Sequence, residues 1–248
     1  MHRILLLGGT TEASLLARAL ATARCDAVFS YAGRTADPVA QPLPQRVGGF
    51  GGVPGLITYL RDHKITHVID ATHPFAAQMS QHAATACQTL ALPLAAFERP
   101  PWQPQSGDMW NPVQTIEEAV KSLPAAPAIV FLAIGRQNLD LFTAAPQHRY
   151  LLRLVDAPTE PLLPHSTAVI GRGPFRFADD LALLQDHDID IIVTKNSGGT
   201  GADAKLTAAR TLGLPVIMVN RPAMPQRPSF ATVAEVMHWL GHTADLGV

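Results

Sequence analysis

The chain of 248 residues contains little cysteine and no long apolar run. Its two cysteines, Cys25 and Cys87, have neither the spacing of a metal site nor that of a redox pair, so we interpret them as ordinary thiols. No apolar stretch reaches the length that a membrane span requires. The first residues lack the pattern of a secretory signal, because a short apolar run passes directly into a glycine turn. We therefore expect a cytoplasmic protein that does not associate with membranes.

Charge is also scarce, and several catalytic motifs are missing. Charged residues make up 16% of the chain and the net charge is -1, which gives no general attraction to nucleic acid. A nucleophile elbow, G-x-S-x-G, does not occur. The glycine loop at 197–201 lacks the Gly-Lys-Ser/Thr ending of a phosphate loop, which argues against a kinase or ATPase. No tyrosine has a lysine four residues on, so a short-chain reductase acting on a small carbonyl compound is a weak alternative.

Hydrophobic residues, by contrast, make up 47% of the chain, which is ample for a buried core. Continuously apolar strands alternate with helical patterns, and this alternation predicts an α/β fold with mostly parallel sheets. The proline-rich and tryptophan-containing stretch Phe97–Pro112 has no period and is the best candidate boundary. We expect two Rossmann-like domains, residues 1–98 and 99–248, with a ligand cleft between them.

The opening of the chain has the pattern of a nucleotide-binding turn. The apolar run Ile4–Leu7 is followed by Gly8 and Gly9, and a helical pattern then begins. The positions of a G-x-G-x-x-G fingerprint read Gly8, Thr10 and Ala13, so one glycine is replaced by a residue whose hydroxyl could bond to phosphate. The alternative is a tight loop between strand and helix without a ligand.

The second strand, Ala27–Tyr31, favours NADP over NAD. An NAD-binding fold places an acidic residue at the end of this strand to meet the ribose hydroxyls, and no acid stands here. Ser30 and Arg34 lie at or just beyond the strand end instead, and an arginine there suits a 2′-phosphate. The alternative is that Arg34 is a surface residue of a loop.

Glycine and polar residues also follow the later strands. Parallel sheets bind ligands beyond the carboxyl ends of their strands, so these loops are candidate binding segments. Four cations in the second half, taken together, suit an anionic ligand with several carboxylates, although each alone could be a solvated surface charge: Arg136, Arg172, Arg176 and Lys195. The loop Ser197–Gly201 can form an anion-binding nest. The glycines around Phe50 in Gly48–Gly52 would let the backbone lie against a flat ligand.

The stretch that contains His67, Asp70 and His73 suggests a metal site, but the geometry argues against one. His67 should begin a strand and His73 should follow its end, and an extended chain separates them by roughly 20 Å. We expect no metal. His73 is a candidate proton donor, and the alternative is a loop histidine bonded to backbone. Pro74 fits the first position of the next helix, with Thr72 or His73 as its cap.

Six stretches together resemble one family, the precorrin-6A reductases, over nearly the whole chain from Ile4 to about Trp239. They stand in order along the sequence: Leu6–Ala13, Ser30–Arg34, Gly48–Gly52, Asp70–Ala76, Ile134–Arg136 and Thr194–Gly199 with Lys205.

The resemblance implies an NADPH-dependent enzyme of cobalamin biosynthesis that reduces one double bond of precorrin-6A, a tetrapyrrole with many carboxylates, to give precorrin-6B. It implies that the NADP phosphates are held by Gly9, Thr10, Thr11 and Arg34. It also implies that the reactive end of the cofactor lies near Thr72, His73 and Pro74. It implies that the macrocycle is contacted by Arg136, Lys195, Asn196 and Ser197, with Gly198 and Gly199 in the same loop. Neighbouring enzymes of the pathway are the expected protein partners.

Two alternatives to this function stay open. An enzyme of the same fold could reduce the cobalt-containing macrocycle of the oxygen-independent route, and no residue separates the two. A protein of another class could bind NADP as a sensor without catalysing a reaction. The sequence also assigns no proton donor beyond the candidate His73.

Overall fold

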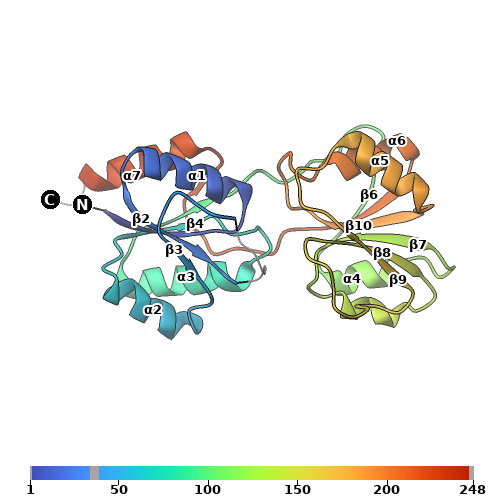
Figure 1. The fold of residues 1–248 in the computed structure, drawn as a ribbon, viewed down its shortest axis with the longest axis horizontal. Coiled ribbons are helices and arrows are strands. Elements are labelled where there is room, and N and C mark those ends of the chain that lie inside the picture. Colours follow the sequence, from blue (N-terminus) through green and yellow to red (C-terminus); the bar gives the residue numbers. More distant parts are fainter. Residues whose placement is uncertain (1, 34–38, 246–248) are drawn as a thin grey trace. The chain divides into compact units, whose positions relative to one another are not determined.

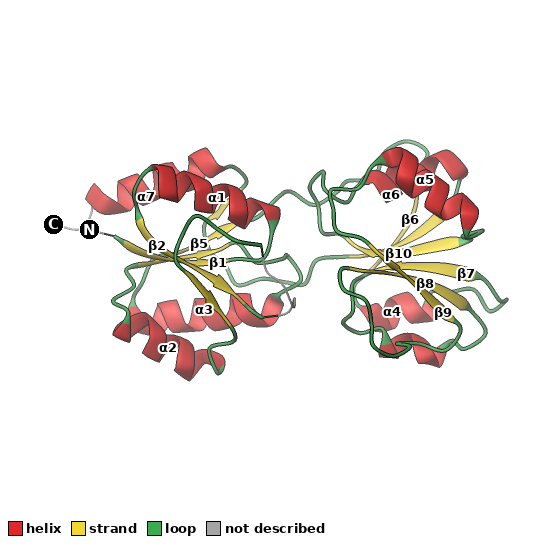
Figure 2. Cartoon of the chain, viewed as in Figure 1, coloured by secondary structure: helices red, strands yellow, loops and turns green. Residues whose placement is uncertain are grey.

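The computed structural model describes residues 2–33 and 39–245. The chain divides into two compact units, Met1–Pro100 with Pro222–Val248, and Pro101–Arg221. Each unit contains a six-stranded parallel sheet covered by helices on both faces (Figures 1 and 2). The expected α/β class with two Rossmann-like, parallel sheets is therefore confirmed, while the expected cleft between the domains stays a prediction.

The first unit has the strand order of a dinucleotide-binding fold. The order is β12-β5-β4-β1-β2-β3, which is the arrangement 3-2-1-4-5-6 of the Rossmann fold when numbered along the unit. Its elements are β1 (Arg3–Leu7), α1 (Thr11–Thr22), β2 (Asp26–Tyr31), β3 (Gln45–Val47), α2 (Gly52–Asp62), β4 (His67–Asp70), α3 (Ala77–Leu90), β5 (Leu94–Phe97), β12 (Ser229–Phe230) and α7 (Val233–Asp245).

The central strand β1 is apolar throughout because both of its faces are buried. Ile4 and Leu6 pack in a core cluster with residues of α1 and α7, whereas Leu5 and Leu7 pack with residues of α2 and α3. Figure 1 shows these two pairs of helices on opposite faces of the sheet. Alternate residues of a strand point to opposite faces, so a sheet covered on both sides needs apolar residues at every position.

The second unit repeats this arrangement with a different order along the chain. Its sheet has the order β6-β11-β10-β7-β8-β9, which again reads 3-2-1-4-5-6 if β7 is counted first. The sixth position is then filled by β6, which precedes β7. The elements are β6 (Met109–Val113), α4 (Ile116–Lys121), β7 (Ile129–Ala133), a 3₁₀ helix η1 (Asp140–Ala144), β8 (Arg149–Leu154), β9 (Ser166–Ile170), α5 (Phe177–Asp186), β10 (Ile191–Lys195), α6 (Ala204–Leu212) and β11 (Pro215–Val219).

The sixth strand of each sheet is the one that the order along the chain would assign to the other sheet. β6 follows β5 in sequence but pairs with β11, and β12 follows β11 but pairs with β5. The expected second domain, 99–248, was therefore wrong for residues 222–248. These residues belong to the first unit because Val236 and Leu240 of α7 are buried in the same core cluster as Leu16 of α1.

The expected start of α3 at Pro74 was also wrong. The helix begins at Ala77, and its N-cap residue Ala76 makes no side-chain capping bond. Thr72 and His73 do not cap the helix because they form turns before it: Thr72 bonds to Asp70, and His73 Nδ1 accepts the Phe75 N–H at 3.2 Å.

None of the helices in the described part of the chain combines the length and apolar character needed to cross a bilayer. The cytoplasmic location stays a prediction.

Candidate functional site

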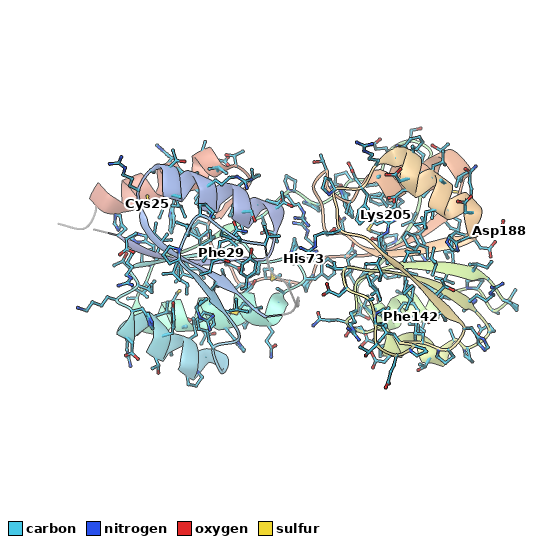
Figure 3. The ribbon with its side chains drawn as sticks, in the orientation of Figure 1. Cys25, Phe29, His73, Phe142, Asp188 and Lys205 are labelled. Atoms are coloured by element: carbon cyan, nitrogen blue, oxygen red, sulfur yellow. The ribbon has the colours of Figure 1, made fainter. Side chains whose placement is uncertain are left out.

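The turn between β1 and α1 requires both of its glycines. Gly8 donates its N–H to the Ser30 carbonyl at 2.9 Å, and an ideal Cβ on Gly8 would lie 2.1 Å from Cζ of Phe29, whose position Figure 3 marks. Gly9 has φ +122°, a conformation that residues with a Cβ rarely adopt, and space around it is open. The turn therefore brings exposed backbone to the end of β1, where a ligand can approach closely.

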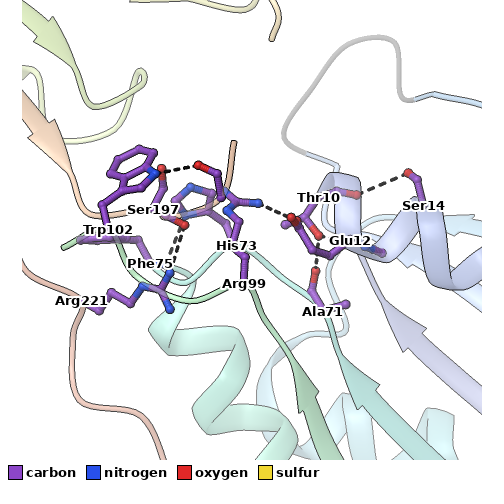
Figure 4. Close-up of polar contacts among 12 residues, drawn as sticks. Thr10, Glu12, Ser14, Ala71, His73, Phe75, Arg99, Trp102, Ser197 and Arg221 are labelled. Carbon is purple, nitrogen blue, oxygen red and sulfur yellow. Dashed lines mark hydrogen bonds and ion pairs between the residues drawn. The ribbon is translucent and has the colours of Figure 1, made fainter. Parts of the chain in front are cut away.

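Thr10 links this turn to the neighbouring strand. Its Oγ1 accepts the Ala13 N–H at 3.1 Å as the N-cap of α1 and donates to the Ala71 carbonyl at 2.8 Å, a contact drawn in Figure 4. The ends of β1 and β4 are thus joined at the point where the strand order reverses, which is where Rossmann folds bind dinucleotides. Since the hydroxyl proton goes to Ala71, a phosphate here would be held by backbone N–H groups of the first turn of α1.

An ion pair next to this turn removes a charge that would repel an anion. Glu12 lies in the first turn of α1, and Arg99 Nη1 approaches its Oε2 to 2.6 Å (Figure 4). Both side chains are largely buried, with exposures of 17% and 18%. The arginine neutralises the carboxylate, so the positive end of the helix dipole stays available to a phosphate.

Asp70, at the end of β4, organises the loop that follows it. Its Oδ1 accepts the Thr72 N–H at 3.2 Å and the Thr72 hydroxyl at 2.6 Å. Its Oδ2 accepts the Ser80 hydroxyl at 2.6 Å and Nη2 of Arg227 at 3.0 Å. The carboxylate therefore fixes Thr72 and, through it, the position of His73.

His73 is exposed in this loop, and Pro74 beside it is buried. Because His73 Nδ1 accepts a backbone proton, the neutral ring carries its own proton on Nε2. In this form Nε2 can donate a hydrogen bond, whereas transfer of a proton requires the imidazolium form, in which Nδ1 no longer accepts the Phe75 N–H.

The residues predicted to bind the cofactor in the β1–α1 turn and in the loop after β4 lie together at the carboxyl end of the first sheet. The Thr10–Ala71 bond joins the turn Gly8–Thr11 to the loop that holds Thr72, His73 and Pro74. Ser30, next to the end of β2, is 4% exposed and accepts a hydrogen bond from Arg46. Arg34 lies outside the described residues, so its expected role stays a prediction. Arg46 was missed, because only the pairing of β2 with β3 reveals that it lies beside Ser30.

A metal site is not apparent in the described part of the chain, where no three histidine, cysteine or acidic side chains are grouped. His67 begins β4, and its ring packs against His2 and Trp239, with centroids 4.3 and 5.7 Å away. Burial lowers the pKa of His67 to about 4. The histidine is therefore a neutral packing residue at the opposite end of the strand from His73.

The second unit has a corresponding loop cluster at its own reversal of strand order. β10 pairs with β7, so the loops after Lys195 and after Ala133 leave neighbouring strands at the same edge. Lys195 is the last residue of β10 and is half-buried. Arg136 is exposed and follows Gly135, which has φ +78°. Lys195 and Arg136, two of the cations predicted to bind the ligand, therefore both lie at or just beyond the carboxyl ends of neighbouring strands of this sheet.

Asn196 is held by the chain itself, and its expected contact with the macrocycle stays a prediction. It is 8% exposed, its Oδ1 accepts the Trp102 N–H at 2.7 Å, and its Nδ2 donates to the Trp102 carbonyl at 3.0 Å. Both ends of the amide are therefore bound by the chain itself. We interpret Asn196 as a residue that fixes the loop after β10.

Further contacts hold the glycines of this loop, as Figure 4 shows for Trp102, Ser197 and Arg221. The Trp102 indole donates to the Gly199 carbonyl at 2.6 Å, and Arg221 donates to the Ser197 carbonyl at 3.1 Å. The Lys205 ammonium lies 4.5 Å from the centroid of the Trp102 ring and donates to the Ala202 carbonyl. Gly198 and Gly199 both have positive φ, 69° and 73°. Ordered glycines of this kind can present backbone N–H groups to an anion.

Comparison with known proteins identifies the family of the chain. The family described as "Precorrin-6x reductase CbiJ/CobK" matches residues 3–241. A precorrin-6A reductase of Rhodobacter capsulatus is 60% identical over 241 residues, which are 97% of this chain and 96% of that protein. One from Sinorhizobium sp. is 49% identical over 97% of this chain and 93% of its own length.

A more distant relative and a solved structure extend the comparison. A cobalt-precorrin-6A reductase of Priestia megaterium is 30% identical, with 96% of this chain and 97% of that protein covered. The solved structure of "CobK precorrin-6A reductase" superposes with a TM-score of 0.94 at 59% identity and covers 98% of this chain and 97% of its own. The chain is therefore an oxidoreductase that belongs to the precorrin-6x reductase family.

Proposed function

We propose that this chain reduces one double bond of precorrin-6A to give precorrin-6B in cobalamin biosynthesis, with NADPH as the hydride donor. The observation that carries the proposal is the 60% identity, over nearly the full length of both chains, to a protein named precorrin-6A reductase. Three of the resembling stretches lie at the ends of strands, where ligands bind in parallel sheets: Leu6–Ala13, Asp70–Ala76 and Thr194–Gly199.

The turn between β1 and α1 has the features that the cofactor's pyrophosphate requires. Backbone N–H groups of the first turn of α1, at Thr11 and Glu12, provide donors, and the Arg99 ion pair offsets the charge of Glu12. Space at Gly9 is open to a ligand. When bound, NADPH supplies the hydride; the chain orients it through this turn and through the loop that holds Thr72, His73 and Pro74.

The second unit supplies groups that suit the carboxylates of the macrocycle. Lys195 and Arg136 offer positive charge, and Ser197, Gly198 and Gly199 offer hydrogen-bond donors in an ordered loop. Reduction of a double bond adds a hydride and a proton. His73, in its protonated imidazolium form, is the candidate donor of the proton, and water is the alternative.

The metal-free macrocycle is the preferred substrate of the two considered. Identity is 60% to the precorrin-6A reductase of Rhodobacter capsulatus and 30% to the cobalt-precorrin-6A reductase of Priestia megaterium. This difference favours the metal-free compound, although both proteins belong to one fold.

The test is to mix the protein and NADPH with precorrin-6A, and separately with cobalt-precorrin-6A, and to follow the nicotinamide absorbance. We expect rapid oxidation of NADPH with the metal-free macrocycle and slower oxidation with the cobalt form. If the protein binds NADPH but oxidises it with neither macrocycle, it is a non-catalytic binding protein and the proposal fails. Faster turnover of the cobalt macrocycle would reassign the substrate.

A further inference from the structure

Arg46 lies where a Rossmann fold recognises the ribose of a bound dinucleotide. Residues at the end of β2 contact this ribose in the Rossmann fold. Ser30 is the next-to-last residue of β2, and its partner in the register with β3 is Arg46. The inference below rests on the proposed use of a nicotinamide dinucleotide at the turn after β1.

The guanidinium of Arg46 is held rigidly. Nη1 donates to Oγ of Ser30 at 2.7 Å, and Nη2 donates to the Gly49 carbonyl at 3.1 Å. The guanidinium carbon lies 3.9 Å from the centroid of the Phe50 ring and 5.2 Å from that of Tyr59. Stacking on an aromatic face fixes the plane of the group. The loop that carries Phe50 depends on its glycines, because Gly48, Gly51 and Gly52 have positive φ.

The surroundings of Arg46 give its charge no carboxylate partner among the described residues. Other partly buried arginines do have one, as in the pairs Arg99–Glu12, Arg153–Asp180, Arg210–Asp108 and Arg227–Asp70. Burial lowers the pKa of Arg46 from its ordinary value, which reflects the cost of removing the cation from water. A bound anion would offset that cost.

A phosphate can be added without disturbing the contacts of Arg46. A guanidinium has five N–H donors, and the bonds to Ser30 and Gly49 take one from each terminal nitrogen. Because Ser30 Oγ accepts from Arg46, the serine can donate its own hydroxyl proton to the same anion. Arginine is suited to this task because its donors match two phosphate oxygens at once.

We propose that Arg46, with Ser30, binds the 2′-phosphate of NADPH and sets the preference for NADPH over NADH. The competing explanation is purely structural: Arg46 would pin the loop 48–52 and contribute equally to the binding of both cofactors. The two explanations differ in how substitution changes the ratio of the two affinities.

The experiment measures dissociation constants of NADPH, NADH, 2′,5′-ADP and 5′-AMP for the full chain and for Arg46→Gln. We expect Arg46→Gln to weaken NADPH and 2′,5′-ADP by about 10- to 100-fold and to change NADH and 5′-AMP by less than about 3-fold. Arg61→Gln, which removes an exposed charge from α2, is the matched control and should change none of them.

Equal weakening of all four ligands, or no weakening of any, would overturn the proposal for Arg46. Ser30→Ala provides a second variant if Arg46→Gln does not fold, and it too should weaken NADPH but not NADH, by about 3- to 10-fold. An unchanged ratio in Ser30→Ala would likewise refute the proposal. If the unaltered protein itself does not prefer NADPH, the choice of NADPH in the proposed function fails, which differs from losing the role of Arg46 alone.

Discussion

Asp70 is a buried carboxylate whose bonds connect three segments of the first unit. It accepts from Thr72 in the following loop, from Ser80 in α3 and from Arg227 in the segment that returns from the second unit. The side chains of Asp70 and Arg227 are only 1% and 6% exposed. Burying both charges is costly, so removing one partner leaves the other uncompensated in a poorly solvated position.

Arg227→Ala should therefore lower the free energy of unfolding by about 3–5 kcal/mol, measured by denaturant titration. Arg3→Ala is the matched control, because its pair with Asp26 is exposed and 3.7 Å long, and it should cost less than about 1 kcal/mol. The double variant Asp70→Asn with Arg227→Leu should be less destabilised than Arg227→Ala, since no charge is left unpaired. Equal costs for Arg227→Ala and Arg3→Ala would show that the buried pair does not have this role.

Lys195 and Asn196 are adjacent in sequence but should respond differently to substitution. Lys195→Ala should weaken binding of precorrin-6A by about 10-fold and leave NADPH affinity and stability nearly unchanged, because a cation for a substrate carboxylate is lost. Asn196→Ala should lower stability by about 1–3 kcal/mol, because both bonds to Trp102 disappear. Macrocycle titrations and thermal unfolding of both variants check this. An unaltered macrocycle titration in Lys195→Ala would remove Lys195 from the site.

The β1–α1 turn depends on contact between Gly8 and the ring of Phe29. A methyl group at Gly8 would overlap the ring, so Gly8→Ala should destabilise the protein by about 1–3 kcal/mol in thermal or chemical unfolding. Adding Phe29→Leu should recover part of that loss. A tolerated Gly8→Ala with no effect of Phe29→Leu would mean that the turn adjusts freely.

Gly241→Ala in α7, where a Cβ meets nothing within 4 Å, should instead stabilise by about 0.5–1 kcal/mol.

Strands with two buried faces, such as β1 and β10, carry the continuously apolar pattern by which a sequence predicts a strand. That pattern is absent from β3, β6 and β12, and all three are at sheet edges. An edge strand has one neighbour and exposed residues, so it needs no apolar pattern; β6 even contains Pro112. The exchange of β6 and β12 between the sheets could not be predicted, because local patterns do not specify the partner of an edge strand.

The loops of the candidate site were predictable, but the bonds within them were not. Glycines after apolar strands marked the turn at Gly8 and the loop after Lys195. The contacts that order these loops join residues far apart in sequence, as in Asp70 with Arg227 and Asn196 with Trp102. Such pairs leave no periodic signal, and for that reason the contacts of Arg46 with Ser30 and of Asn196 with Trp102 could not be predicted.

Both termini of the chain contribute to the first unit, and His67 lies where they meet. Its ring contacts His2 near the start of the chain and Trp239 of α7, and Thr66 Oγ1 lies 3.0 Å from its Nδ1. Burial, the larger cause, and the nearby His2 lower the pKa of His67 to about 4. The ring must therefore stay neutral for the unit to keep its packing.

This shift predicts a loss of stability in mild acid. The unfolded chain binds a proton at His67 near pH 6.5 and the folded chain only near pH 4, so stability falls as pH drops from about 6.5 to 4. At pH 5 the loss from this group should be about 1–2 kcal/mol. Unfolding of His67→Gln, compared with the unaltered protein at pH 7.5 and 5, should show a smaller decrease. His165→Asn, which also removes one histidine, should keep the full decrease; equal decreases in all three proteins would contradict the assignment.

We propose that this chain transfers a hydride from NADPH to a double bond of precorrin-6A. The most direct measurement supplies the protein with precorrin-6A and NADPH carrying deuterium at nicotinamide C4, on one face and then on the other, and weighs the product by mass spectrometry. We predict that the product gains one deuterium from one face and none from the other, in step with NADPH oxidation. A reduced product that contains no deuterium from either face would contradict the account.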